Sequence, residues 1–256
     1  MLSREKIMAL DHNFLLSMGQ LMSNSVLGAF FDSYRFSIYT SGIPDDNWNV
    51  VFVKRTTSKP LKVIEDWEQF FNQRQMRFRV RFSPGTEVDF LPLLRNRGYQ
   101  KADSVPVMTL ENLPEKMDEK DDLIIRKVVT PEELHDFQEA GEKGFSLPNG
   151  AGPYVMTEQT FNLPEIEMFI GYSEAKPVCT SMLFQTGAIA GIYWVSTLPE
   201  YRKRGFGEAI TLKAVIAGKD RGCTLANLQA SAMGKPVYER MGFDNPYDYL
   251  AYRSPV

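Results

Sequence analysis

The chain has 256 residues and a formal net charge of −3, with 43% hydrophobic and 24% charged residues. This length is enough for one large domain or two ordinary ones, and the composition excludes long disordered or fibrous segments. Arg202, Lys203 and Arg204 form the only basic cluster, which is too short to follow a polyanion, so nucleic acid is not expected as a partner.

The N-terminal sequence has no signal-peptide core, and no stretch approaches the roughly 20 apolar residues of a membrane span. We therefore expect a cytoplasmic protein with no membrane partner. Cys179 and Cys223 lack CxxC spacing, and His12 and His135 are far apart in sequence. These residues predict no metal site and two buried, reduced cysteines. Monomer and homodimer both stay open.

The N-terminal half predicts a mixture of helices and strands. Two helices and two strands are expected from the hydrophobic periodicity and turn residues, at 3–22, 60–73, Asn49–Lys54 and Val105–Leu110. The clearest strand is Met76–Phe82, in which apolar residues alternate with arginines, as in a strand with one buried face. A short helix should end at Gly98, before the closing strand of this half.

Residues 112–122 are dominated by charged residues and prolines, a composition typical of a solvated linker. We place the domain boundary there. Residues 1–118 then form a second, smaller N-terminal α/β domain, and residues 122–256 form the main domain.

The main domain should open with a strand at Leu123–Val128 and a helix whose start is marked by Thr130-Pro131-Glu132-Glu133. Residues 145–163 are too long for an ordinary connection, so we expect either a lid over a site or a mobile segment. An antiparallel meander of three strands should follow, at Glu165–Tyr172, Val178–Gln185 and Ala188–Ser196.

The last of these strands leads through Arg202-Lys-Arg-Gly205-Phe-Gly207 into a helix with an apolar face. Glycines let a backbone approach an anion closely, and the free N–H groups and dipole at a helix start attract negative charge. The pattern predicts a pyrophosphate site. A Rossmann fingerprint would need glycine at Ile210, and a P-loop would need Gly-Lys-Ser/Thr. A glycine-rich helix start with solvated basic side chains is the remaining alternative.

The pattern Arg202-x-x-Gly205-x-Gly207, after a strand that ends in Val195, resembles the acetyl-CoA-binding signature of the GNAT acetyltransferase superfamily. Lys235–Phe243 resembles the closing helix of that family, with its tyrosine and its Gly-Phe ending. The resemblance implies an α/β (α+β) fold over 122–256, with a mixed, mostly antiparallel sheet flanked by helices. It also implies acetyl-CoA or coenzyme A as acyl donor, without a metal. The implied coenzyme-binding residues are Val195, Ser196, Thr197, Arg202, Lys203, Arg204, Gly205, Phe206, Gly207 and Glu208.

Tyr238 lies in the first turn of the short helix, and the resemblance places that turn near the thiol end of the coenzyme. A tyrosine of pKa about 10 stays protonated at neutral pH and can donate to a thiolate of pKa about 8.5, so Tyr238 is the candidate general acid. The alternative is an aromatic packing residue. A backbone N–H near Val195 would polarise the thioester carbonyl. No base is identifiable, because Glu165 and Glu167 are more typical of surface positions.

The sequence Leu94-Arg-Asn-Arg-Gly98-Tyr99 echoes Tyr238-Glu-Arg-Met-Gly242-Phe243. In this alignment Leu94 stands where the second copy has Tyr238, and the first half has no Arg-x-x-Gly-x-Gly loop. We therefore expect a degenerate GNAT-like half, without a coenzyme site of its own, that walls the acceptor cleft.

These observations predict a cytoplasmic enzyme that transfers an acetyl group from acetyl-CoA to a primary amine of a small molecule or peptide by direct attack. A non-catalytic acyl-CoA-binding or sensor protein is one alternative. An aminoacyl transferase of the tandem GNAT-like type is the other.

Overall fold

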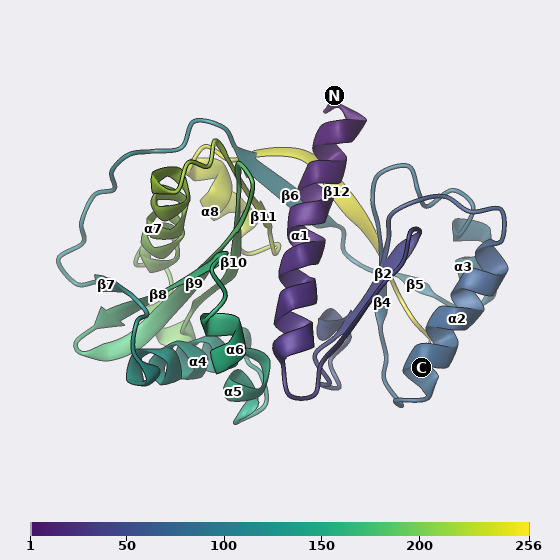
Figure 1. Ribbon diagram of the computed structural model, residues 1–256, viewed down its shortest axis with the longest axis horizontal. Helices are drawn as coiled ribbons and strands as arrows, with labels where there is room; N and C mark the ends of the chain where they lie inside the picture. The colour runs from purple at the N-terminus through teal and green to yellow at the C-terminus, as the bar shows by residue number, and fades with distance from the viewer. Residues whose placement is uncertain (1, 256) are drawn as a thin grey trace.

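The computed structural model describes residues 2–255, and within them twelve strands form one continuous mixed sheet with helices on both faces (Figure 1). The strands are β1 Ala29–Asp32, β2 Phe36–Thr40, β3 Asn49–Val53, β4 Arg79–Phe82, β5 Gln100–Lys101, β6 Val105–Leu110, β7 Ile124–Lys127, β8 Ile166–Ser173, β9 Lys176–Thr186, β10 Ile189–Thr197, β11 Leu225–Gln229 and β12 Asp244–Arg253. The helices are α1 Arg4–Asn24, α2 Pro60–Asn72, α3 Leu91–Asn96, α4 Pro131–Phe145, α5 Ala151–Val155, α6 Glu158–Phe161, α7 Phe206–Asp220 and α8 Lys235–Arg240, and two short 3-10 turns are η1 Asp46–Trp48 and η2 Pro199–Tyr201.

The strand order is β1-β2-β3-β4-β12-β6-β11-β10-β9-β8-β7, and β5 pairs with β12 at the side. The pairs β3/β4 and β10/β11 are parallel, whereas the other strand pairs of this sheet within residues 2–255 are antiparallel. The predicted fold class, a mixed and mostly antiparallel sheet flanked by helices, is therefore confirmed.

Local sequence signals explain most of these elements. Thr130 caps α4 through a complete capping box, in which its side chain accepts from the Glu133 N–H and the Glu133 carboxylate accepts from the N–H of Thr130. In α2, Ile64, Trp67 and Phe71 recur at helical spacing and are fully buried. The predicted strand at 76–82 begins only at Arg79, and its buried residues alternate with half-exposed arginines as expected.

Two segments differ from the sequence expectation. The hairpin of β1 and β2 had no glycine, asparagine or proline in its turn to signal it; instead, the Ser33 N–H and hydroxyl both donate to the Phe36 carbonyl. Residues 145–163, expected as a lid or a mobile loop, contain the short helices α5 and α6. The Gln138 amide of α4 donates to the Met156 carbonyl at 2.6 Å, so this segment is packed onto α4.

The two halves of the chain exchange strands. β6, expected to close the N-terminal half, lies instead between β11 and β12. β12 pairs with β6 over its first part, and its end, Leu250–Arg253, pairs with β4. The halves therefore share one sheet, and the domain limits 1–118 and 122–256 stay a prediction.

Helix α1 runs between the two groups of elements in Figure 1, and it is anchored by buried polar residues. Asn13 has no exposed surface, and its amide nitrogen donates to the Phe184 carbonyl at 3.2 Å. Its amide oxygen accepts from the Tyr193 hydroxyl at 2.6 Å and from the Asn227 amide at 2.8 Å. Asn13 therefore connects α1 to β9, β10 and β11.

Asp11 lies two residues earlier, on the opposite side of α1, and makes the equivalent connection to the other strands. Its carboxylate accepts hydrogen bonds from the hydroxyls of Ser83, Tyr249 and Tyr247. Burial raises the pKa of Asp11 above its ordinary value, although these three hydroxyl donors oppose the shift. α1 is thus hydrogen-bonded to both parts of the sheet.

No helix within residues 2–255 has the length and apolar character required to cross a bilayer. Cys179 and Cys223 are both buried and are not in disulfides, as predicted.

Asn13→Ala should destabilise the protein by about 2–3 kcal/mol, because a buried donor or acceptor left unsatisfied costs about 1–3 kcal/mol. The free energy of unfolding can be measured in urea by tryptophan fluorescence. Gln20→Ala removes an amide from an exposed position of the same helix and should change stability by less than about 0.5 kcal/mol. Equal stabilities of the two variants would show that Asn13 does not hold the halves together.

Candidate functional site

The predicted anion-binding loop connects β10, through η2, to the first turn of α7. Lys203 (φ 63°) and Gly205 (φ 77°) both have left-handed backbone conformations, and Gly205 is the N-cap of this 15-residue helix. Glycine adopts that conformation without strain and leaves the first-turn N–H groups accessible to an anion. The loop therefore leads from a strand into a glycine-capped helix start.

The three basic side chains of the loop have different roles. The Arg202 guanidinium donates to the carbonyls of Thr197 (3.1 Å) and Gly144 (3.2 Å), so it fixes the loop to α4. The Arg204 guanidinium pairs with Asp122 at 2.6 Å. Lys203 is exposed, and no carboxylate within residues 2–255 pairs with it. Arg202 thus supports the loop, and Lys203 is the loop cation available to a ligand.

A fourth cation, Lys120, was not anticipated from the sequence. Its ammonium nitrogen lies 2.9 Å from the position that a Cβ on Gly205 would occupy. A positive charge at the positive end of a helix dipole is unfavourable unless an anion lies nearby. The linker around Lys120 has the charged composition of a solvent-exposed segment. Only the fold of the chain brings Lys120 close to Gly205. The site is therefore more cationic than the loop sequence indicates.

The other predicted residues in the first turn of α7 offer mainly backbone N–H groups to a ligand. The Phe206 side chain is buried in the core, 4.8 Å from the Arg204 guanidinium. A Cβ on Gly207 would lie 3.3 Å from the Thr197 hydroxyl, which is tight contact. Glu208 is the acidic residue of the first turn and is half-buried. A side chain at Gly207 would therefore require the Thr197 hydroxyl to move slightly.

Strands β10 and β11 separate before the loop. They pair only where Ile189–Gly191 faces Leu225–Asn227, whereas β10 continues to Thr197. Between Tyr193 and Ser196 the register of β10 with β9 shifts, and Trp194 has the rare left-handed φ of 52°. A β-bulge of this kind re-aims the backbone next to functional sites. The predicted residues Val195, Ser196 and Thr197 lie on this separated part of β10.

Tyr238 lies on α8 with 9% of its surface exposed, and its ring packs 5.8 Å from that of Phe243. Burial raises the pKa of Tyr238 to about 12, opposed by a hydrogen bond with the Thr211 side chain. Thr211 in turn donates to the Gly207 carbonyl at 2.7 Å. The fold therefore connects the Tyr238 hydroxyl to the first turns of α7, and the phenol stays protonated at neutral pH.

Of the two glutamates considered as bases, one is held in ion pairs and the other is exposed. Glu167 pairs with Lys127 at 3.1 Å and with Arg221 at 3.2 Å, so its carboxylate is occupied in ion pairs. Glu165 contributes its backbone carbonyl to the Gln185 N–H. This agrees with the structural interpretation of both residues. Within residues 2–255, no group of three His, Cys, Asp or Glu side chains could hold a metal ion.

Residues 164–245 match the model of the acetyltransferase (GNAT) domain. No curated protein has a sequence that matches this chain.

Several solved structures share the fold over most of the chain. A GCN5-related N-acetyltransferase from Kribbella flavida has 15% identity and a TM-score of 0.71, with 97% of this chain and 96% of that chain covered. A GCN5-related N-acetyltransferase from Sphaerobacter thermophilus has 17% identity and a TM-score of 0.65, with 88% and 82% covered.

A tandem GNAT protein from the clavulanic acid biosynthesis pathway is also similar, with 12% identity, a TM-score of 0.57, and 96% and 94% of the two chains covered. At these identities the structural likeness establishes the fold alone, and the family-model match is confined to residues 164–245. Residues 164–245 are therefore similar to the GNAT acetyltransferase domain, and the fold of the chain is similar to those of GNAT-related structures over nearly its whole length.

Proposed function

We propose that the protein is an acetyl-CoA-dependent N-acetyltransferase whose donor site lies at the start of α7. The observation that carries this proposal is the position of Lys120 above the left-handed Gly205, at a helix N-terminus whose first-turn N–H groups have no side-chain cap and no partner within the helix. A cation at that position is favourable when a phosphate lies between it and the helix. The family match of residues 164–245 makes coenzyme A the natural source of that phosphate.

The residues present fit the coenzyme. The N–H groups of Gly205, Phe206, Gly207 and Glu208 would bind the pyrophosphate together with the ammonium groups of Lys120 and Lys203. Arg202 and Arg204 keep the loop in place through their contacts with Gly144 and Asp122. The unpaired part of β10, at Val195, Ser196 and Thr197, would receive the amide groups of the pantetheine arm. When bound, the coenzyme supplies an activated acetyl thioester.

Tyr238 would act as the general acid for the departing thiolate. Its pKa of about 12 keeps the proton on the phenol throughout the physiological range. As the C–N bond forms and the C–S bond breaks, the phenol would donate its proton to the departing sulfur, which leaves as a neutral thiol. The proton that the acceptor nitrogen loses on becoming an amide would return to the phenolate, so the step balances. A backbone N–H near Val195, at the bulge of β10, would stabilise the negative charge on the carbonyl oxygen. No protein base is assigned, so the acceptor amine is proposed to attack in its neutral form.

The N-terminal half is proposed to wall the acceptor site, because one of its residues touches the bulge. Trp48 of η1 lies 5.4 Å from Trp194 and 5.9 Å from Phe145, measured between ring centroids. This contact places the N-terminal half beside the separated part of β10. The acceptor itself is proposed to be a primary amine of a small molecule or peptide.

A second candidate is a non-catalytic acyl-CoA-binding protein, favoured by the burial of Tyr238. A ring with 9% exposure, packed on Phe243, is also what a purely structural tyrosine shows. Turnover of acetyl-CoA with a panel of amines separates the two, because a sensor binds the coenzyme without releasing thiol.

Lys120→Gln should weaken coenzyme A binding about tenfold, since a hydrogen bond to a charged group contributes about 1.5–3 kcal/mol and 1.4 kcal/mol is a factor of ten. Calorimetric titration measures the affinity. Lys116→Gln removes the same charge from an exposed position of the same segment and should leave the affinity nearly unchanged. Equal affinities of both variants and the wild type would remove Lys120 from the site.

Tyr238→Phe should lower kcat by about 10²–10⁴-fold, the usual contribution of a positioned acid, with little change in coenzyme affinity or thermal stability. Tyr201→Phe removes another hydroxyl beside α7, from a ring stacked on Phe206, and should retain activity. Single-turnover rates should be compared, because slow product release hides a chemical defect. Near wild-type single-turnover rates in Tyr238→Phe would overturn the assignment of the acid.

A further inference from the structure

A large cavity lies between α1 and the N-terminal part of the sheet, away from the proposed coenzyme site. Its volume is about 1130 Å³, and its lining includes none of the loop residues 195–208 and not Tyr238. It lies beyond the carboxyl ends of the parallel strands β3 and β4, where Lys54 and Ser83 follow the last strand residues. Such strand ends are common ligand sites in α/β proteins.

The charges on the cavity wall are unbalanced. Lys54 is neutralised by Asp32, at 2.7 Å, and Asp11 is satisfied by three hydroxyl donors. Arg4 and Arg55 also line the cavity, and neither has a carboxylate partner within residues 2–255. The wall therefore holds three cationic side chains against two carboxylates, and both guanidinium groups lack an ion-pair partner within residues 2–255.

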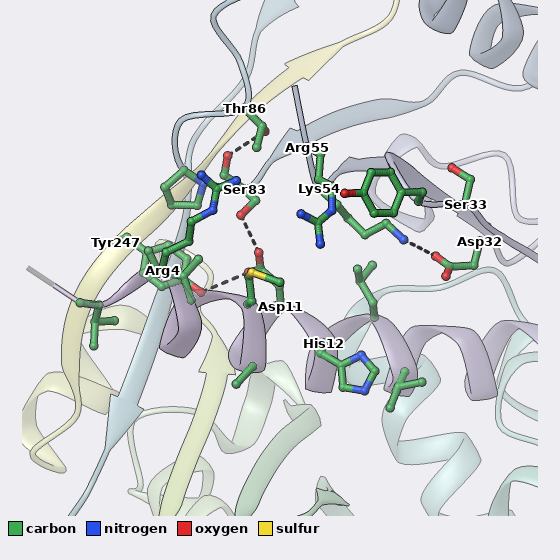
Figure 2. Close-up of a pocket in the computed structure, with 18 of the residues that line it drawn as sticks. Arg4, Asp11, His12, Asp32, Ser33, Lys54, Arg55, Ser83, Thr86 and Tyr247 are labelled. Carbon is green, nitrogen blue, oxygen red and sulfur yellow. Dashed lines mark hydrogen bonds and ion pairs between the residues drawn. The ribbon is translucent and has the colours of Figure 1, made fainter. Parts of the chain in front are cut away.

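Figure 2 shows how these groups are placed. In that view, Asp11 points from α1 toward Ser83 and lies between Arg4 on one side and Arg55 on the other. The Arg55 guanidinium is 4.4 Å from the centroid of the Tyr34 ring, which holds it without neutralising it. An arginine held in this way is ready for bidentate contact with a carboxylate or phosphate.

Most of the remaining wall is apolar and partly exposed, with His12, Ser33 and Thr86 as polar exceptions. Met8 and Leu16 of α1 line the cavity with 45% and 38% of their surface exposed, and Phe30 lines it from β1. Apolar side chains left open beside unpaired cations match a ligand with one charged end and one apolar body.

We propose that this cavity binds a small molecule with an anionic head group, a carboxylate or phosphate monoester, on an apolar body. Arg55 and Arg4 hold the head group, and the apolar body lies along Met8, Leu16 and Phe30. The cavity is a separate binding site from the donor site, and α1 connects them physically, because Asp11 borders the cavity while Asn13 is bonded to β10 and β11.

The test is calorimetric titration of the full chain with octanoate, octyl phosphate, octylamine and acetate. We expect one octanoate or octyl phosphate per chain, with octylamine and acetate at least tenfold weaker. The tighter of the two anions identifies the head group. Absence of binding by both anions, or equal binding of octylamine, would overturn the proposal.

Matched variants locate the site. The double variant Arg4→Gln, Arg55→Gln should weaken binding of the anion at least tenfold, whereas Arg77→Gln, an exposed arginine of the same half outside the cavity, should not. Unchanged anion affinity in the double variant would also overturn the proposal. Its coenzyme A affinity should equal that of the wild type, so this test succeeds or fails independently of the proposed acetyltransferase function.

Discussion

The buried polar anchors of α1 are the interaction on which the rest of the structure depends. Asn13 and Asp11 are two residues apart, and their side chains bond to opposite parts of the sheet. Each of these two side chains has several protein hydrogen-bond partners in place of water. An amide or carboxylate buried without such partners would lower the stability of the fold. A single helix thereby fixes the position of the two halves relative to each other. Apolar packing alone, which is not directional, would define that position less precisely.

The strand exchange reinforces that constraint and serves the site. β6, which comes from the first half of the chain, lies between β11 and β12. β11 borders the separated end of β10, so it is held in place by a strand from the other half. The end of β12 continues into pairing with β4. The split between β10 and β11 therefore lies inside a continuous sheet, where its geometry is supported from both sides. A rigid opening of this kind suits the proposed binding of an extended pantetheine arm.

Sequence reasoning located the elements whose signals are local. The capping box at Thr130, the alternation before Phe82 and the glycine-rich start of α7 all depend on residues within one or two turns of each other. The same reasoning could not find what depends on long-range pairing. Nothing in Val105–Leu110 indicates that it pairs with β11 rather than with its own half.

In the candidate site, too, some residues could be predicted from a local sequence pattern and others are brought together only by the fold. Arg202, Gly205 and Gly207 were visible because spacing along one loop carries their pattern. The structure changes the interpretation of Arg202, whose guanidinium is bound to backbone carbonyls and so supports the loop. Lys120 was hidden in a charged linker, and only the path of that linker across the start of α7 brings its ammonium to Gly205.

The most direct test of the central claim, that coenzyme A binds at the start of α7, is amide hydrogen exchange of the full chain with and without the coenzyme. We expect slower exchange at residues 203–209, where first-turn N–H groups would donate to phosphate, and at 192–197 on β10. We expect no change at 54–64, the corresponding strand-to-helix junction of the N-terminal half. Protection at 54–64, or none at 203–209, would contradict binding of the coenzyme at the start of α7.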